Sequence, residues 1–92
     1  ADLGDYSQVE LVAGKLSDPD AYVRAAAAFA LGRLRVAESV PSLIRALEED
    51  DREVVRREAY LALRKITGKD LSRRPDDWAR WWKEREGRGG EE

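Results

Sequence analysis

The sequence contains no cysteine, no histidine and no methionine among its 92 residues. Without cysteine the chain can form neither a disulfide nor a thiolate metal site, and without histidine it lacks the commonest metal ligand and the usual general base near neutral pH. No serine or threonine, Thr67 included, therefore has a histidine to activate it. The phosphate-cradling motifs GxGxxG and the P-loop are also missing. These absences predict that the protein is not an enzyme and that it binds no metal or cofactor.

Long apolar runs are missing as well. No segment approaches the roughly 20 residues that cross a bilayer, and none resembles a signal peptide. We therefore expect no membrane association and a cytoplasmic location. The chain begins at Ala1 rather than at a methionine, which predicts a processed protein, a fragment of a longer array or a designed protein.

Charged and apolar residues are both abundant, at 39% and 42% of the chain. This apolar content is too large for a disordered chain, so we expect one small domain whose helices carry the two kinds of residue on opposite faces. The formal net charge is -2, divided into -4 on residues 1–50 and +2 on residues 51–92. A negative total argues against a protein built mainly to bind nucleic acid.

An acidic turn, a Val-Arg pair and an apolar stretch occur twice in this order. The two arginines, Arg24 and Arg56, are 32 residues apart, whereas the leucines that precede the turns, Leu16 and Leu47, are 31 apart. We therefore place one inserted residue just before the second Val-Arg pair. A repeat of this length is typical of stacked helical units, each of which buries its apolar face on its neighbour.

Apolar spacing predicts five helices. The first four cover about residues 6–16, 20–34, 39–48 and from the acidic run 49–51 to the residue before Gly68; the fifth opens at Pro75. Spacings of three and four residues select the side chains that we expect to be buried. These are Val9, Val12, Ala13, Leu16, then Val23, Ala27, Ala30, Leu31, Leu34, then Val40, Leu43, Ile44, Leu47, then Val55, Ala59, Ala62, Leu63, Ile66, and lastly Trp78, Trp81, Trp82.

These helices form one predicted domain over residues 1–86. It consists of repeat units at about 6–34 and 38–67 and a capping segment at 68–86. Residues 87–92 are rich in glycine and charge, and we expect them to form a disordered tail.

Two consecutive segments carry a family resemblance. They read LSDPDAYVRAAAAFALGRL and AESVPSLIRALEED. With their recurring turn, Val-Arg and Ala-Leu positions, residues 9–67 resemble HEAT-like repeats of the bilin-lyase type, and ITGKDL followed by WARWW is similar to the segment that caps such arrays. Two departures are the displaced second Val-Arg pair and Arg64, which replaces the glycine of the first copy, Gly32.

The resemblance implies an all-α, right-handed α-solenoid of antiparallel helical hairpins with a C-terminal capping helix. It also implies that the second helix of each hairpin lines a concave face used for recognition. We expect a protein-protein interaction module or scaffold whose partner is another protein. The positions that the buried stripes leave outward on this face are Tyr22, Ala25, Ala26, Phe29, Arg33, Arg57, Glu58, Leu61 and Lys65.

Phe29, Tyr22 and Leu61 have two interpretations of equal weight. Large apolar side chains on such a face are common interface anchors, but neighbouring helices could also cover them in so small a stack. The first helix has no preceding repeat over it, so outer residues such as Val9 and Leu11 could meet a second copy of the chain.

Three other functions remain as alternatives. Resemblance to bilin lyases implies an auxiliary factor that handles a tetrapyrrole, and some longer HEAT-like proteins bind nucleic acid. The chain could also be an engineered scaffold without native activity. Basic pairs at 56–57, 64–65 and 73–74 favour nucleic acid, but Glu53, Glu58 and Asp70 interrupt them.

Three polar or aromatic clusters are interpreted as architecture. The tryptophans could stack on bases, but their helical spacing favours a cap over the last repeat. The acidic run 48–51 lacks the alternating ligands and central glycine of a calcium loop, so a solvated helix terminus is expected. Arg24 and Arg56 are expected to pair with acids of the turns.

Overall fold

The computed structural model describes the backbone of residues 4–91 and the side chains of residues 9–85. The described backbone is helical and contains no strand, which confirms the all-α prediction. Its elements are α1 (Gly4–Gly14), the 3-10 turn η1 (Lys15–Ser17), α2 (Ala21–Leu34), the 3-10 turn η2 (Ala37–Ser39), α3 (Val40–Glu49), α4 (Glu53–Thr67) and α5 (Pro75–Glu91). None of the described helices is both long and apolar enough to cross a membrane.

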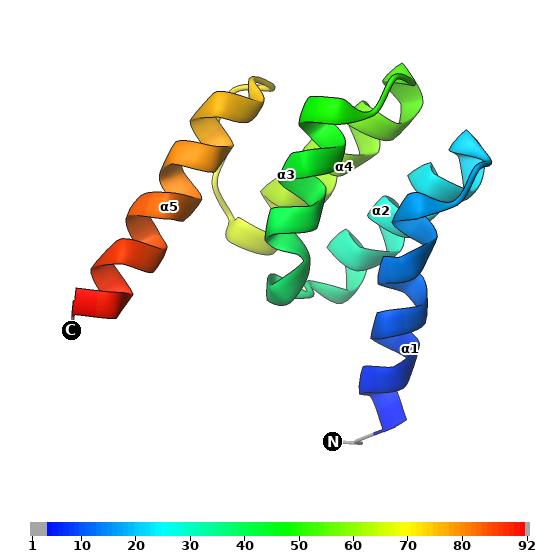
Figure 1. Cartoon of the computed structure of the whole chain (residues 1–92), viewed down its shortest axis with the longest axis horizontal. Coiled ribbons are helices and arrows are strands. Elements are labelled where there is room, and N and C mark those ends of the chain that lie inside the picture. Colours follow the sequence, from blue (N-terminus) through cyan, green and yellow to red (C-terminus); the bar gives the residue numbers. More distant parts are fainter. Residues whose placement is uncertain (1–3, 92) are drawn as a thin grey trace.

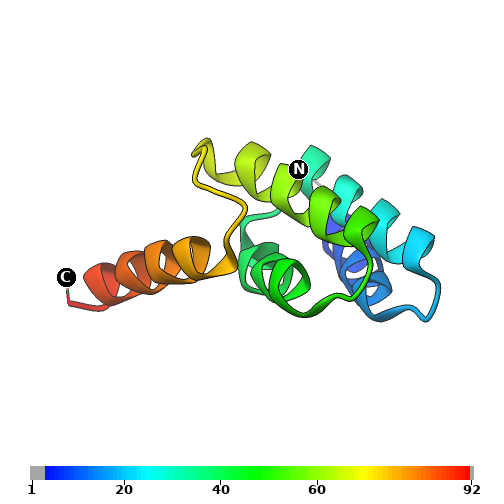
Figure 2. The same cartoon turned by 90° about the horizontal axis from the view of Figure 1, so that it is seen from above.

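The helices form two rows. In Figure 1, α1, α3 and α5 lie next to one another in this order, and α2 and α4 lie behind α1 and α3. Figure 2, seen from above, separates α2 and α4 as a second row that lies over α1 and α3, whereas α5 extends beyond it. Each hairpin of the sequence repeat therefore contributes one helix to each row.

Both predicted stripes of the second repeat are confirmed. In α3, all four predicted residues are buried, and in α4 four of the five are buried while Ile66 is partly buried. Apart from Val55, which packs in a second cluster with Ala21 and Ala25, the buried residues of these stripes join one core with residues of α2 and Trp78 of α5. The buried members of this core are Ala28, Leu31, Val36, Val40, Leu43, Ile44, Leu47, Ala59, Ala62, Leu63 and Trp78.

The predicted stripe of α2 is partly wrong. Leu34 is 58% exposed, whereas Ala25, predicted to face outward, is only 6% exposed. The cause is the close approach of α4: a β-carbon added to Gly32 would lie 2.6 Å from the Cα atom of Ala62. Helix α2 packs on α4 through its glycine and alanine residues. The most buried face of α2 is therefore not the face that carries its larger apolar side chains.

The residue offset between the two copies lies earlier than predicted. Asp18 and Asp50 each accept a backbone N–H from the residue two positions later, at 2.9 and 3.0 Å, so the turns that lead to the Val-Arg pairs match. The preceding helix ends differ: Asp18 donates its N–H to Lys15 in a 3-10 turn, and Asp50 donates to Ala46 in an α turn. The extra residue therefore belongs to the end of α3.

Helix ends follow local chemistry. Asp20 caps α2 by accepting the N–H of Tyr22 at 2.8 Å, and a proline occupies the first turn of α3. Gly68 ends α4 with a φ of 71°, the left-handed conformation that glycine adopts without strain. Arg35 ends α2 with a φ of 55°, a conformation that is costly for a residue with a β-carbon.

The C-terminal helix is longer than predicted. Its backbone is helical to Glu91, where the sequence analysis expects a disordered tail over 87–92. Adding residues to an existing helix costs far less than starting one, so α5 can continue through glycines that disfavour helix by about 1 kcal/mol each. Residue 92, and the side chains after residue 85, lie outside the described part of the chain.

Candidate interaction surface

The outward faces of α2 and α4 carry most of the predicted site residues. Tyr22 is 70% and Phe29 46% exposed, so both present aromatic surface to solvent. Among the others, Ala26, Arg33, Arg57 and Lys65 are exposed, Glu58 and Leu61 are partly buried, and Ala25 is buried. Ala25 therefore does not belong to this surface, because α4 covers it.

Phe29 of α2 and Lys65 of α4 contact each other at the surface, where the two helices lie side by side. The ammonium group of Lys65 lies 4.9 Å from the centroid of the phenylalanine ring, within the range of a cation-π contact. A hollow of about 140 Å³ lies beside this contact. Its lining residues are Phe29, Glu58, Leu61, Ala62 and Lys65.

A second hollow of about 320 Å³ continues from the first along α4. It shares Leu61 and Lys65 with the first hollow and is otherwise lined by Arg64, Gly68, Lys69 and Asp70. These other four residues are not among the predicted site residues. The signal for the last two was Gly68: a left-handed glycine reverses the chain direction, so the residues after it return across the end of α4.

The side chain of Asp70 is held at the edge of the second hollow. Its Oδ1 atom accepts a hydrogen bond from the Tyr60 hydroxyl at 2.9 Å and lies 3.4 Å from the Nε atom of Arg64. The hydrogen bond to the carboxylate raises the pKa of Tyr60, and burial adds to that shift. The rim is therefore built from paired charges on one side and from the exposed Lys65 and Lys69 on the other.

The predicted pairing of Arg24 with a turn acid is confirmed. Its Nε and Nη2 atoms donate to the carboxylate of Asp50 at 2.8 and 3.1 Å, and Nη1 donates to the backbone carbonyl of Asp18 at 2.8 Å. Arg56 repeats the last contact with the carbonyl of Asp50 at 2.7 Å and pairs with Glu53 at 3.1 Å. These arginines connect turns and helices, which makes them parts of the architecture.

Burial and hydrogen bonding act against each other at Asp50. Burial by itself would raise the pKa of its carboxyl group, but the hydrogen bonds from Arg24 and from the N–H of Arg52 lower it further than burial raises it. The pKa of Asp50 is therefore below its ordinary value. Ionised Asp50 stabilises the junction between the two repeats.

The tryptophans of α5 face the protein. Trp78 is fully buried, and its indole N–H donates to the carbonyl of Ser72 at 2.7 Å. Its ring meets Tyr60 and Trp81 edge to face, with centroids 6.5 and 6.3 Å apart. Trp78 thus has no free face on which a base could stack. No group of three or more acidic side chains within the described residues is arranged to hold a metal ion.

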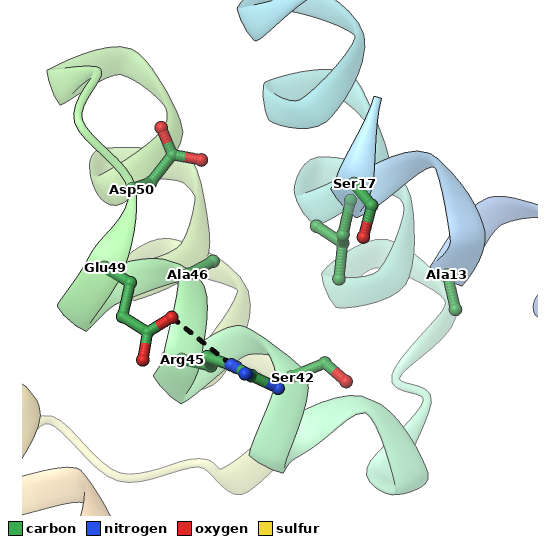
Figure 3. Close-up of a pocket in the computed structure, with 8 residues that line it drawn as sticks. Ala13, Ser17, Ser42, Arg45, Ala46, Glu49 and Asp50 are labelled. Atoms are coloured by element: carbon green, nitrogen blue, oxygen red, sulfur yellow. Dashed lines mark hydrogen bonds and ion pairs between the residues drawn. The ribbon is translucent and has the colours of Figure 1, made fainter. Parts of the chain in front are cut away.

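A separate groove of about 430 Å³ lies between α1 and α3. Figure 3 shows the labelled side chains of α3 facing Ser17 and Ala13 across it, with Arg45 and Glu49 joined on the α3 side at 3.3 Å. Polar atoms make up most of its lining, so it resembles a water-filled gap more than an anchoring pocket. The sequence analysis did not predict it, because it depends on how far apart the first helices of the two hairpins lie.

Comparison with known families finds a match to a repeat family. Residues 9–80, well over half of the chain, match the family described as HEAT repeats. Comparisons with curated proteins and with solved structures find no significant match. The match begins in α1 and ends in α5, so it includes both helical hairpins and the segment that buries Trp78. The paired helices, the repeated acidic turns and the Val-Arg register agree with it. The chain therefore belongs to the HEAT repeat family.

Proposed function

We propose that this protein is a protein-protein interaction module that binds its partner through the outward faces of α2 and α4. HEAT repeats generally mediate protein-protein interaction. One observation of this chain supports the choice of surface: Phe29 is 46% exposed beside the partly buried Leu61 and beneath the ammonium group of Lys65. Exposed aromatic residues at the centre of a surface are frequent anchors of interfaces.

The mechanism is rigid display. The contact between Gly32 and Ala62 sets the distance between α2 and α4, and Arg24 and Asp50 join the repeats beside it. Side chains on such a framework lose little conformational entropy when a partner binds, so more of the contact energy contributes to affinity.

The finer points of the family resemblance enter the same proposal. The two hairpins form a right-handed solenoid of the bilin-lyase type, α2 and α4 line its concave face, and the segment 68–86 caps its last repeat. Self-association through the outer side of α1 is part of the proposal too, and Leu11, 68% exposed there, is the residue that supports it. A cytoplasmic location stays a prediction.

Selection from a random peptide library displayed on phage tests the surface. Peptides that bind the protein should lose binding to a Phe29→Ala/Leu61→Ala variant. They should keep binding to a Leu34→Ala control, which removes an exposed leucine that lines neither hollow. Recovery of peptides that bind all three proteins equally would contradict the proposed surface.

A further inference from the structure

We infer that the two joined hollows on α2 and α4 accept an acidic peptide that carries a bulky apolar side chain. This inference rests on the proposed function and specifies the chemistry of the partner. The joined hollows, called here the Phe29–Lys69 groove, are lined by Phe29, Glu58, Leu61, Ala62, Arg64, Lys65, Gly68, Lys69 and Asp70.

The apolar end of the Phe29–Lys69 groove fits one side chain. Phe29, Leu61 and Ala62 line its first hollow of about 140 Å³. An enclosed cavity of about 150 Å³ holds a benzene-sized group, so a leucine or an aromatic ring matches this space. Burying such a side chain removes apolar surface of both molecules from water and gives the complex an anchor.

The charge around the groove selects an acidic partner. Arg57, Lys65 and Lys69 are exposed, and none of them forms an ion pair with a carboxylate within residues 9–85. Arg33, exposed on α2, adds a fourth positive charge, and Glu58 is the one acid among the predicted outward positions. This face therefore carries an excess of positive charge, although the net charge of the whole chain is -2. Positive patches attract and orient partners of negative charge.

A peptide fits the Phe29–Lys69 groove better than a nucleic acid does. Every nucleotide brings a phosphate, so a strand needs a continuous positive track. Here Glu58 lies in the wall of the first hollow and Asp70 neutralises Arg64 at the second. The ammonium group of Lys65, 4.9 Å from the centroid of the Phe29 ring, also lies over one face on which a base would stack. A peptide can place an uncharged residue opposite Glu58 and carboxylates opposite the lysines.

Fluorescence anisotropy with defined probes tests the inference. The main probe is a short fluorescein-labelled peptide with a Leu-Trp centre flanked by glutamates; one matched peptide has lysines in place of the glutamates, another has Gly-Ser in place of Leu-Trp. Oligo-dT is the nucleic-acid probe. The acidic apolar peptide should bind about tenfold or more tightly than either matched peptide, and added salt should weaken it, since the lysines contribute exposed ion pairs.

Charge reversal locates the binding. Lys65→Glu/Lys69→Glu should weaken the acidic peptide about tenfold or more and favour the lysine peptide. Arg80→Glu/Lys83→Glu, the same charge change on exposed residues of α5, should leave the order of the probes unchanged. Circular dichroism of both variants verifies that they remain folded.

The outcomes separate the two proposals. Equal binding of the acidic and lysine peptides, or no binding of the acidic peptide, overturns the inference while library peptides lost on Phe29→Ala/Leu61→Ala still support the surface. Tighter binding of oligo-dT that depends on Lys65 and Lys69 overturns it in favour of nucleic acid. If Phe29→Ala leaves acidic-peptide binding unchanged and library peptides also ignore that substitution, both proposals fail.

Discussion

The second repeat has two neighbours and packs on them in opposite ways. Its helix α4 packs on α2 through very small residues: Ala62 of α4 lies so close to Gly32 of α2 that a β-carbon on Gly32 would not fit. Toward α5 the positions equivalent to Ala28 and Gly32 are Tyr60 and Arg64, which fill a wider gap with an aromatic ring and a paired guanidinium. Equivalent positions of a repeat therefore have different residues according to what lies next to them.

The difference explains why Arg64 departs from the repeat pattern. A glycine is needed where a second helix approaches closely, and α4 approaches α2 at Gly32. On the other side of α4, Tyr60 contacts Trp78, and the guanidinium groups of Arg64 and Arg73 lie 5.8 and 5.7 Å from the centroid of its ring. On this side of α4 the neighbour is α5, a helix of the first row, and large side chains pack against it; on the other side the neighbour is α2, a helix of the second row.

Trp78→Ala should have the largest effect, because it removes the centre of the aromatic interface. The indole is fully buried, and its loss should lower the free energy of unfolding by about 3–5 kcal/mol. Urea denaturation followed by circular dichroism measures this change. Arg80→Ala, on an exposed position of the same helix, is the control, and equal stability of the two variants would mean that α5 does not support the repeats.

Gly32→Arg gives the first repeat the residue of the second and should break the close interface. The new side chain meets the backbone of Ala62, and pushing α2 and α4 apart should cost about 3 kcal/mol. The reverse change, Arg64→Gly, loses helix propensity, about 1 kcal/mol, and the exposed contacts of Arg64 with Tyr60 and Asp70, which add less than about 1 kcal/mol. Thermal melts of both proteins compare them, and similar losses would show that the two positions are equivalent after all.

Asp50→Asn should have a smaller effect that depends on pH. The substitution keeps an acceptor but removes the charge paired with Arg24, at a cost of about 1 kcal/mol near neutral pH. Because the pKa of Asp50 is lower in the folded protein than in the unfolded chain, its stabilising contribution is present above about pH 4 and is lost as pH falls through the folded value. Unfolding curves of wild type and variant should converge in acid. A constant difference would assign the effect to shape rather than charge.

Phe29→Ala should have the smallest effect on stability. Its exposed ring contributes a cation-π contact and partial burial, so the free energy of unfolding should fall by less than about 1 kcal/mol. Leu31→Ala, two residues along the same helix but fully buried, should cost about 2–5 kcal/mol. Differential scanning calorimetry distinguishes them. A loss at Phe29 as large as that at Leu31 would identify Phe29 as a core residue.

Amphipathic helices were predictable, and the alanine-rich helix was not. In α3 and α4, large apolar residues mark the buried face, so spacing alone identified it. In α2, alanines surround the helix and carry no such contrast, so spacing predicts Leu34 inside and Ala25 outside, and the structure has the reverse. Which face of an alanine-rich helix is buried depends on the approach of its neighbours, which the spacing of its own residues does not encode.

The alignment of the two repeats predicted the outward residues of α2 and α4. The remaining lining residues depend on the reversal of the chain after Gly68. Aligning the copies placed Phe29, Leu61 and Lys65 on one face, and the two hollows bring them together. Lys69 and Asp70 belong to the same groove only because the chain turns back after Gly68. That return is a property of the loop: aligning the two copies does not predict it, whereas the left-handed Gly68 at the end of α4 indicates it.

The junction between Arg24 and Asp50 has a consequence for how the chain folds. These residues are 26 positions apart, and the other interfaces also join segments that are close in the repeat order. Loops of this length close at low entropic cost, so the search for native contacts stays local and folding should be fast. We expect α2, α3 and α4 to form the nucleus, and α5 to join it last, when the indole of Trp78 leaves water.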